Sequence, residues 1–588
     1  MLHFTQVHFR NFKAFADFTL HIKAFNILVG PNNAGKSTII AAFRILSAGI
    51  RRGNARRAGL VQGARGPTLG HRIDLMPLSV SGENVFFNYD DEEPATVRFT
   101  LSNRHALTLY FPEKETCYLI PDAGGHRCES PTHFRKYFDC PIGFVPVLGP
   151  VEADEQLYNE ETARLSLFNY RAARNFRNIW WHFPEPFQEF REAIQSTWPG
   201  MDVKPPELDT SGDKPMLRMY CPEERIDREI VWSGFGFQVW CQMLTHLIQA
   251  RAASIFLIDE PDIYLHSDLQ RQLVGLLRIL GPDILIATHS TEIVTEAEPG
   301  EIVLINKKRR HAKRITDQGD VEAVFKELGS NANPILTQLA KTRRAVFVEG
   351  LDFQILSQFA RKLGNSVIAN RAAFAVIPMG GFNPERAAIL KEGIELTLGS
   401  KIQSVAVLDR DYRSEAECDE LANDSRKFNQ IVRIHTRKEL ENFLLVPAAI
   451  DRAIAARIED RAKRLGSKCN DPPTALEMLG EFRAQQRQYV MSRYIELSKR
   501  FQKRQGSQIH PDKLTELAIA EFEALWSEDE NTFALIPGKS ALAYINQQLQ
   551  GSCAVSISNL AIATAMKVSE IPEEMKSLLE ELHEFTKD

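Results

Sequence analysis

A glycine-rich loop at residues 30–37 constrains the fold of this chain more than any other feature. Its sequence, Gly30-Pro31-Asn32-Asn33-Ala34-Gly35-Lys36-Ser37, fits the pattern G-x-x-x-x-G-K-[ST]. The apolar run 25–29 before it predicts a strand, and the amphipathic stretch from Lys36 to about Ser47 predicts a helix. In such a loop, backbone N–H groups surround phosphates, the lysine reaches the β and γ oxygens, and the serine hydroxyl ligates Mg²⁺. We therefore expect an α/β domain that binds ATP and Mg²⁺. The expected binding residues are Asn32, Asn33, Gly35, Lys36, Ser37 and Thr38, with Ser37 as a magnesium ligand.

Two later apolar runs end in polar residues of the kind that surround a nucleotide. Residues 255–258 are followed by Asp259 and Glu260, and residues 284–287 lead to His289. Such short apolar runs predict buried parallel strands, whose carboxyl ends meet at one edge of a sheet. There Asp259 would hold Mg²⁺ directly or through water, Glu260 would polarise the attacking water, and His289 would sense the γ-phosphate.

Together with the segment Ser233-Gly234-Phe235-Gly236-Phe237-Gln238, these motifs resemble those of the ABC/SMC-type ATPase head. The resemblance rests on GPNNAGKS, SGFGFQ, FLIDEPDIYLH and ATHS. It implies that Ser233, Gly234 and Gly236 cap the ATP of an opposite subunit, so that two copies close over two nucleotides. For the glutamine loop of that family, both Gln62 and Gln156 are candidates.

A second group of carboxylates follows two apolar runs farther along the chain. Val346-Phe347-Val348 leads to Glu349 and, after two residues, Asp352; Val405–Leu408 leads to Asp409-Arg410-Asp411. Carboxylates gathered at two strand ends require divalent cations, and alternation along an extended D-x-D would point both acids the same way. Mg²⁺ or Mn²⁺ held there could activate water for phosphodiester cleavage. This arrangement resembles the TOPRIM domain of topoisomerases, primases and nucleases.

The order of the two motif sets resembles the OLD (overcoming lysogenization defect) nucleases, in which an ABC-type ATPase precedes a TOPRIM domain. Several bacterial anti-phage nucleases, including the Gabija effector and retron-associated effectors, belong to this group. The resemblance implies that Glu349, Asp409, Asp411 and Lys539, with Glu260 in the ATPase, are catalytic. It also makes Glu441 an additional metal ligand, for which a surface ion pair is the structural alternative. The chain departs from the family pattern at Phe353 and Phe382, where an acid and a lysine are common.

These motifs predict an α/β chain of two domains, each with an insertion. Residues 1–151 and 231–335 would form the ATPase, interrupted by a helical insertion at 152–230 that we expect to mediate dimerisation. Residues 343–588 would form the TOPRIM domain, with a helical insertion at 448–530.

Composition excludes several other classes of protein. The eight cysteines lack C-x-x-C spacing, so we expect neither disulfides nor structural zinc, which fits a reducing cytoplasm. The absence of about 18 consecutive apolar residues predicts no membrane span and argues against a transporter ATPase. The basic runs 51–57 and 307–314 are either solvated surface or contacts to a phosphate backbone.

The expected function is that of an ATP-regulated, metal-dependent DNA endonuclease or nickase in bacterial anti-phage defence. The expected partners are DNA, further copies of the chain joined through the ATPase heads, and a system-specific protein or nucleic acid. The alternative is an ATP-switched DNA clamp or sensor whose TOPRIM domain does not catalyse. Topoisomerase chemistry would need a nucleophilic tyrosine from a separate domain, which the sequence does not reveal.

Overall fold

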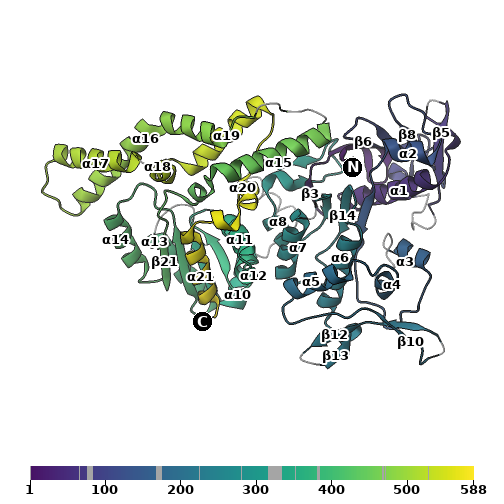
Figure 1. Cartoon of the computed structure of the whole chain (residues 1–588), viewed down its shortest axis with the longest axis horizontal. Coiled ribbons are helices and arrows are strands. Elements are labelled where there is room, and N and C mark those ends of the chain that lie inside the picture. Colours follow the sequence, from purple (N-terminus) through teal and green to yellow (C-terminus); the bar gives the residue numbers. More distant parts are fainter. Residues whose placement is uncertain are drawn as a thin grey trace. The chain divides into compact units, whose positions relative to one another are not determined.

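The chain forms two compact units in its computed structural model. One comprises Met1–Asn331 with Lys463–Gly466, and the other comprises Ala332–Ala462 with Ser467–Asp588. The structure describes residues 2–64, 66–75, 84–166, 175–212, 214–223, 226–279, 281–315, 334–350, 353–379, 384–465, 469, 472–527 and 529–587. Figure 1 shows the whole chain.

The first unit contains a six-stranded sheet in the order β17-β16-β3-β15-β14-β9. All neighbours are parallel except β16 and β17, so the carboxyl ends of β3, β14 and β15 lie at the same edge. The strands are β3 (Phe25–Val29), β9 (Ile142–Val145), β14 (Ile255–Asp259), β15 (Asp283–Ala287), β16 (Ile302–Leu304) and β17 (Lys313–Arg314). The helices are α1 (Lys36–Ala55), α6 (Phe235–Gln249), α7 (Ser267–Ile279) and α8 (Thr291–Thr295), with the 3₁₀ turn η6 (Pro299–Glu301).

An antiparallel sheet in the order β2-β1-β6-β7-β8-β5-β4 covers the other side of α1. Phe43 of α1 packs edge-on against Phe4 and Phe99 of the sheet, with ring centroids 5.4 and 4.9 Å apart. The strands are β1 (Phe4–Phe12), β2 (Phe15–His21), β4 (Gly59–Gly63), β5 (Gly66–Ile73), β6 (Ala95–Leu101), β7 (Ala106–Phe111) and β8 (Cys117–Asp122). The short helix η3 (Phe87–Tyr89) lies between β5 and β6, and α2 (Pro131–Tyr137) follows β8.

The predicted helical insertion at 152–230 is only partly helical. It begins with α3 (Glu160–Ser166), α4 (Phe176–His182) and α5 (Phe187–Thr197). It ends in two β-hairpins and the 3₁₀ turn η5, namely β10 (Glu207–Asp209), β11 (Met216–Arg218), β12 (Tyr220–Glu223), β13 (Ile226–Glu229) and η5 (Ile230–Trp232). The prediction is wrong over these hairpins because Pro205, Pro206 and Pro215 are incompatible with a helix interior.

The second unit is built on a four-stranded sheet, β19-β18-β20-β21, in which every neighbouring pair is parallel. The central strands β18 (Arg344–Val348) and β20 (Gln403–Leu408) are apolar runs buried from both faces. The edge strands β19 (Ala375–Pro378) and β21 (Ile431–Ile434) are partly exposed. The surrounding helices are α10 (Pro334–Thr342), α11 (Phe353–Lys362), α12 (Ser366–Ala369), α13 (Pro384–Leu398), α14 (Glu415–Ser425) and α21 (Glu573–Lys587). Helix α21 packs against α11 and α12 (Figure 1).

A helical region follows the sheet in the same unit. It comprises η7 (Leu440–Leu444), α15 (Pro447–Leu465), α16 (Ala475–Arg504), α17 (Pro511–Trp526), α18 (Asp529–Leu535), α19 (Gly538–Ser552), α20 (Asn559–Ala565) and η8 (Val568–Glu570). Helices α16 and α17 run side by side (Figure 1). Thr474 and Glu477 form a capping box that fixes the start of α16. No helix within the described residues is both long and apolar enough to span a bilayer.

The expectation of no disulfides is wrong. Cys469 and Cys553 form a disulfide in the helical region, across 84 residues of sequence. Local cysteine spacing carries no information about a pair that is joined only by the tertiary fold. The inference of a reducing compartment, which rested on the absence of disulfides, therefore loses that support.

Candidate functional site

Two glycines allow the loop between β3 and α1 to take its conformation. Gly35 has φ +110°, and a Cβ on it would lie 2.4 Å from the Phe15 ring. A Cβ on Gly30 would lie 2.6 Å from the Ile305 carbonyl oxygen. Because no larger residue fits at either position, the backbone can fold tightly around the start of α1. The strand and helix predicted on either side of this loop are confirmed.

The Lys36 side chain is buried at the base of this loop. Its Nζ donates to the Gly30 carbonyl oxygen at 2.9 Å and lies 2.6 Å from Nε2 of His289. Burial lowers the pKa of Lys36, while the carboxylates of Glu260 and Asp259 oppose the shift. Burial and the charge of Lys36 lower the pKa of His289, so a neutral ring can accept a hydrogen bond from the ammonium. The structure thus brings Lys36 and His289 together.

The two acids after β14 have different surroundings. Asp259 is buried, which raises its pKa against the opposing positive charges of Arg44 and Lys36. Glu260 has φ +44°, and its Oε1 lies 3.7 Å from Nε2 of His289. Burial, followed by the charge of Asp262, raises the pKa of Glu260 to about 7. A carboxyl group poised near neutral pH suits a general base that accepts a proton from water.

Sequence reasoning missed residues that support these acids. Thr288 Oγ1 donates to Asp262 Oδ1 at 2.6 Å and accepts from the Ser290 backbone N–H at 2.9 Å. Ser290 in turn caps α8. Asp262 could have been recognised from the sequence, because it is the third acid within four residues at the end of β14.

The residues of the predicted capping segment lie where α6 begins. Gly234 is the N-cap of α6, Ser233 ends the preceding 3₁₀ turn, and Gly236 lies against the Tyr264 carbonyl oxygen. The Gln238 side chain donates to the Ser233 carbonyl oxygen at 2.8 Å and accepts from the Val151 N–H at 2.9 Å. This buried glutamine therefore fixes the conformation of the segment.

The two candidates for the glutamine loop, Gln62 and Gln156, lie in different parts of the first unit. Gln62 pairs with Pro67 in the β4–β5 hairpin. Gln156 bridges to Met216, and its carbonyl oxygen accepts from Asn178.

In the second unit, Glu349 and Asp409 follow the adjacent strands β18 and β20. Glu349 Oε2 accepts a hydrogen bond from the Asp409 backbone N–H at 3.0 Å. Burial raises the pKa of Glu349, and the negative charge of Asp411 raises it further. Arg413 and Lys539 act in the opposite direction. The predicted site residues Asp409, Asp411 and Lys539 therefore all lie close enough to Glu349 to influence its charge.

The geometry of Asp409 and Asp411 differs from the predicted extended D-x-D. Asp411 has φ +53°, so the chain turns immediately after β20. The prediction that an extended backbone points Asp409 and Asp411 the same way is therefore wrong. Buried Asp409 accepts from the Leu440 N–H at 3.1 Å. Asp411 pairs with Arg413 at 3.0 Å and lies 3.8 Å from Lys438 Nζ. Sequence reasoning missed both cations.

Glu441 lies in η7 and is 3% exposed, which contradicts the alternative of a surface ion pair. The Lys539 Nζ lies 3.7 Å from Glu441 Oε1, while its backbone N–H donates to Glu439 Oε1 at 2.6 Å. Gly538 allows this close approach, since a Cβ there would lie 2.8 Å from Asn442 Oδ1. The start of α19 is therefore packed directly onto η7.

The donor chemistry of this acidic site fits a hard divalent cation, because its candidate ligands are carboxylate oxygens. Asp352, the remaining predicted ligand, lies outside the described residues. Among the residues that the structure describes, no three His, Cys, Asp or Glu side chains form a group able to hold a metal ion. Asp411 is instead paired with Arg413.

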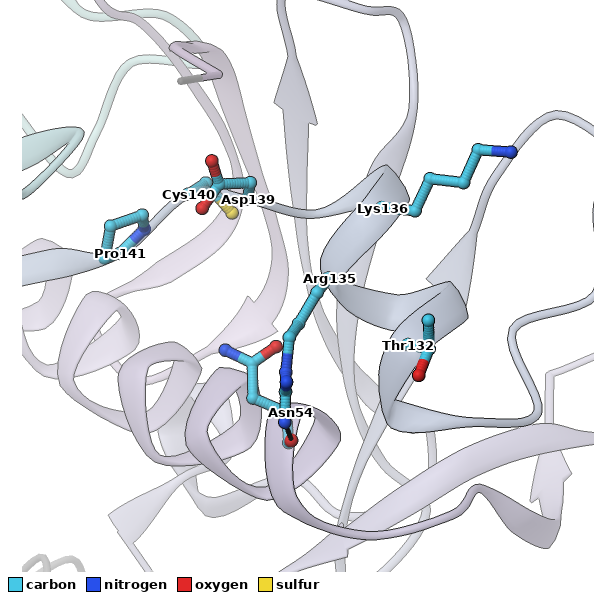
Figure 2. Close-up of a pocket in the computed structure, with 7 residues that line it drawn as sticks. All are labelled: Asn54, Thr132, Arg135, Lys136, Asp139, Cys140 and Pro141. Carbon is cyan, nitrogen blue, oxygen red and sulfur yellow. Dashed lines mark hydrogen bonds between the residues drawn. The ribbon is translucent and has the colours of Figure 1, made fainter.

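Cavities occur in both units of the chain. One of about 570 Å³ lies between the end of α1 and α2, where Arg135 reaches toward Asn54 and Lys136 points away (Figure 2). It contains none of the predicted site residues, so we assign it no role. Another, of about 430 Å³, lies in the second unit and includes Asp411 in its wall.

Two protein-family models match the N-terminal half of the chain. The model described as "AAA ATPase domain" matches residues 4–180. The model described as "AAA domain, putative AbiEii toxin, Type IV TA system" matches residues 150–295. The first unit therefore carries an ATPase domain of the AAA type. No curated protein matches the chain.

Solved structures of SMC heads show a weak likeness. A SmcHead bound to the C-winged helix domain of ScpA is 14% identical, with a TM-score of 0.35 over 53% of this chain and 96% of that one. The Smc head with an extended coiled coil from Pyrococcus furiosus is 13% identical, with a TM-score of 0.35 and coverage of 56% and 100%. The SMC head of Thermotoga maritima is 13% identical, with a TM-score of 0.31 and coverage of 54% and 99%. These TM-scores are too low to support a conclusion about this chain.

Proposed function

We propose that the chain is an ATP-regulated, divalent-metal-dependent endonuclease or nickase that acts on DNA. The observation that carries the proposal is the contact between Glu349 and the backbone of Asp409, with Asp411 and Lys539 close enough to influence the Glu349 charge. Acids at the ends of parallel strands, next to a lysine, suit the stabilisation and cleavage of a phosphodiester.

Each residue of this acidic site has a role in the proposal. Glu349, Asp409 and Asp411 would hold Mg²⁺ or Mn²⁺, with Glu441 and Asp352 as further ligands. When bound, such an ion supplies an activated water and neutralises charge on the phosphate. Lys539 lies 3.7 Å from Glu441 and would stabilise the negative charge that develops on the phosphate oxygens. Asp411 would exchange its pairing with Arg413 for the cation.

In the ATPase unit, Lys36 would contact the nucleotide phosphates, and Ser37 and Asp259 would hold Mg²⁺. Glu260 would accept the proton of the attacking water, consistent with its pKa of about 7. Ser233, Gly234 and Gly236 would cap the nucleotide of a second copy, so that ATP promotes a closed homodimer or a higher oligomer.

The biological role that we propose is bacterial anti-phage defence. The name of one matching family model refers to a toxin of a type IV toxin–antitoxin system, and a nuclease controlled by an ATPase would suit such a role.

The test is cleavage of supercoiled plasmid DNA by the full chain, with Mg²⁺ or Mn²⁺ and with or without ATP. The double variant Asp409→Ala/Asp411→Ala should lose cleavage and keep ATP binding. Asp424→Ala, which alters an exposed acid paired with Lys427, is the matched control. Undiminished cutting by the double variant would refute the assignment of the acidic site.

An ATP-switched DNA clamp or sensor is the second candidate. Two observations favour it: the described residues lack a three-ligand metal group, and Asp411 is neutralised by Arg413. Tight DNA binding that depends on ATP, without cleavage in either metal, would support the clamp.

A further inference from the structure

The cavity of about 430 Å³ in the second unit is lined by cations and tyrosines. The loop after β20 contributes Arg410 and Tyr412, and the turn after β21 contributes Arg437 and Lys438. Tyr494 of α16 forms part of the opposite wall. We call this cavity the arginine pocket. Its size is within the range of cavities that bind small ligands.

The protein backbone holds Arg410 and Arg437, whereas Lys438 pairs with Glu439 at 2.8 Å. Arg410 donates to the carbonyl oxygens of Arg413 and Thr436 at 3.0 and 3.4 Å. Arg437 donates to the Asn442 carbonyl oxygen at 2.8 Å and lies over the Phe443 ring. In the described part of the chain, no carboxylate forms an ion pair with Arg410. Guanidinium groups fixed in this way are preorganised to bind a phosphate.

The side chain of Tyr412 contributes to the pocket wall. Tyr412 is 7% exposed, and its hydroxyl has no hydrogen-bond partner among the residues that the structure describes. Lys438 Nζ lies 5.5 Å from the centroid of the Tyr412 ring. Because the hydroxyl oxygen is closed off from solvent, Tyr412 shapes the wall of the pocket, and the pocket cations are left to bind a ligand.

The position of the arginine pocket relates it to the acidic site. Asp411 lies in the pocket wall, and its backbone N–H donates to the Lys438 carbonyl oxygen at 2.8 Å. A ligand in the pocket would therefore lie beside the residues that we assign to phosphodiester cleavage.

We propose that the arginine pocket binds the nucleotide that neighbours the scissile phosphate on the substrate strand. Arg410 and Arg437 contact its phosphate. This assignment rests on the proposed nuclease function. The helical region supplies one wall through Tyr494, so the insertion takes part in substrate binding.

The experiment measures binding of a fluorescein-labelled single-stranded oligonucleotide to the full chain by anisotropy, in EDTA so that no cleavage occurs. Arg410→Gln and Arg437→Gln should each weaken binding about fivefold or more. Arg426→Gln, an exposed arginine of α14 that bonds to Asn423, is the control and should bind like the wild type. Thermal unfolding of each variant is measured in parallel. A loss of binding without a change in unfolding temperature assigns the effect to the pocket and not to the fold.

A second arm replaces the oligonucleotide with a labelled mononucleotide. Selective loss of oligonucleotide binding supports a strand in the pocket, whereas selective loss of mononucleotide binding identifies a free-nucleotide site and overturns the proposal. Wild-type oligonucleotide affinity in both folded variants also overturns it. If the wild type binds but never cuts with metal, the nuclease function fails separately.

Discussion

His246 provides a sharp prediction about the stability of the ATPase unit at low pH. It is 2% exposed on α6, and burial lowers its pKa from 6.5 to about 4, against an opposing backbone hydrogen bond with Phe144. Folding therefore favours neutral His246 over its protonated form. The associated stability is complete above about pH 6.5 and is lost as the pH falls toward 4. Protonation of His246 therefore lowers the free energy of unfolding by about 2 kcal/mol at pH 5 and by about 3 kcal/mol at still lower pH.

The matched variant is His246→Gln, which retains an N–H donor without a titrating group. Urea unfolding can be followed by tryptophan fluorescence, since Trp180, Trp198 and Trp240 all lie in this unit. Buried carboxyl groups with raised pKa, such as Glu260, gain stability on acidification, so only the difference between variant and wild type isolates His246. The wild type should lose about 2 kcal/mol relative to His246→Gln between pH 7.5 and 5. Parallel pH dependence of the two proteins would refute the reasoning.

Three further outcomes are expected. Glu260→Gln should reduce ATP hydrolysis, measured by phosphate release, by about 10²- to 10⁴-fold. ATP binding, measured by nucleotide fluorescence, should persist. An unchanged rate of hydrolysis would exclude Glu260 as the general base. Gly538→Ala should destabilise the second unit by about 1–3 kcal/mol in thermal unfolding, because its Cβ would lie 2.8 Å from Asn442 Oδ1. Gly551→Ala on the same helix, where the added Cβ meets nothing within 4 Å, should be neutral or stabilising. Equal behaviour of the two glycine variants would contradict the packing of α19 on η7.

The sequence predicts best where function and folding depend on the same local pattern. Residues 25–29 and the helix from Lys36 are predicted because apolar runs and a glycine-rich turn are local signals. The contact between Glu349 and Asp409 can also be predicted from the sequence, since both residues follow apolar runs that become neighbouring parallel strands.

Other features depend on contacts between distant residues. The pairing of Asp411 with Arg413 depends on the turn at Asp411, and the approach of Lys438 depends on the packing of the turn after β21. The disulfide between Cys469 and Cys553 and the arginine pocket likewise join segments separated by many residues. Only the tertiary structure reveals these relationships.

The most direct measurement of the central claim is metal-dependent nicking of supercoiled plasmid by the purified chain, with Asp409→Asn/Asp411→Asn in parallel. These substitutions preserve the size of the side chains and remove the negative charges that we assign to cation binding. We predict nicking by the wild type in Mg²⁺ or Mn²⁺, none in EDTA, and none by the double variant. Equal nicking by the wild type and the double variant would contradict the account.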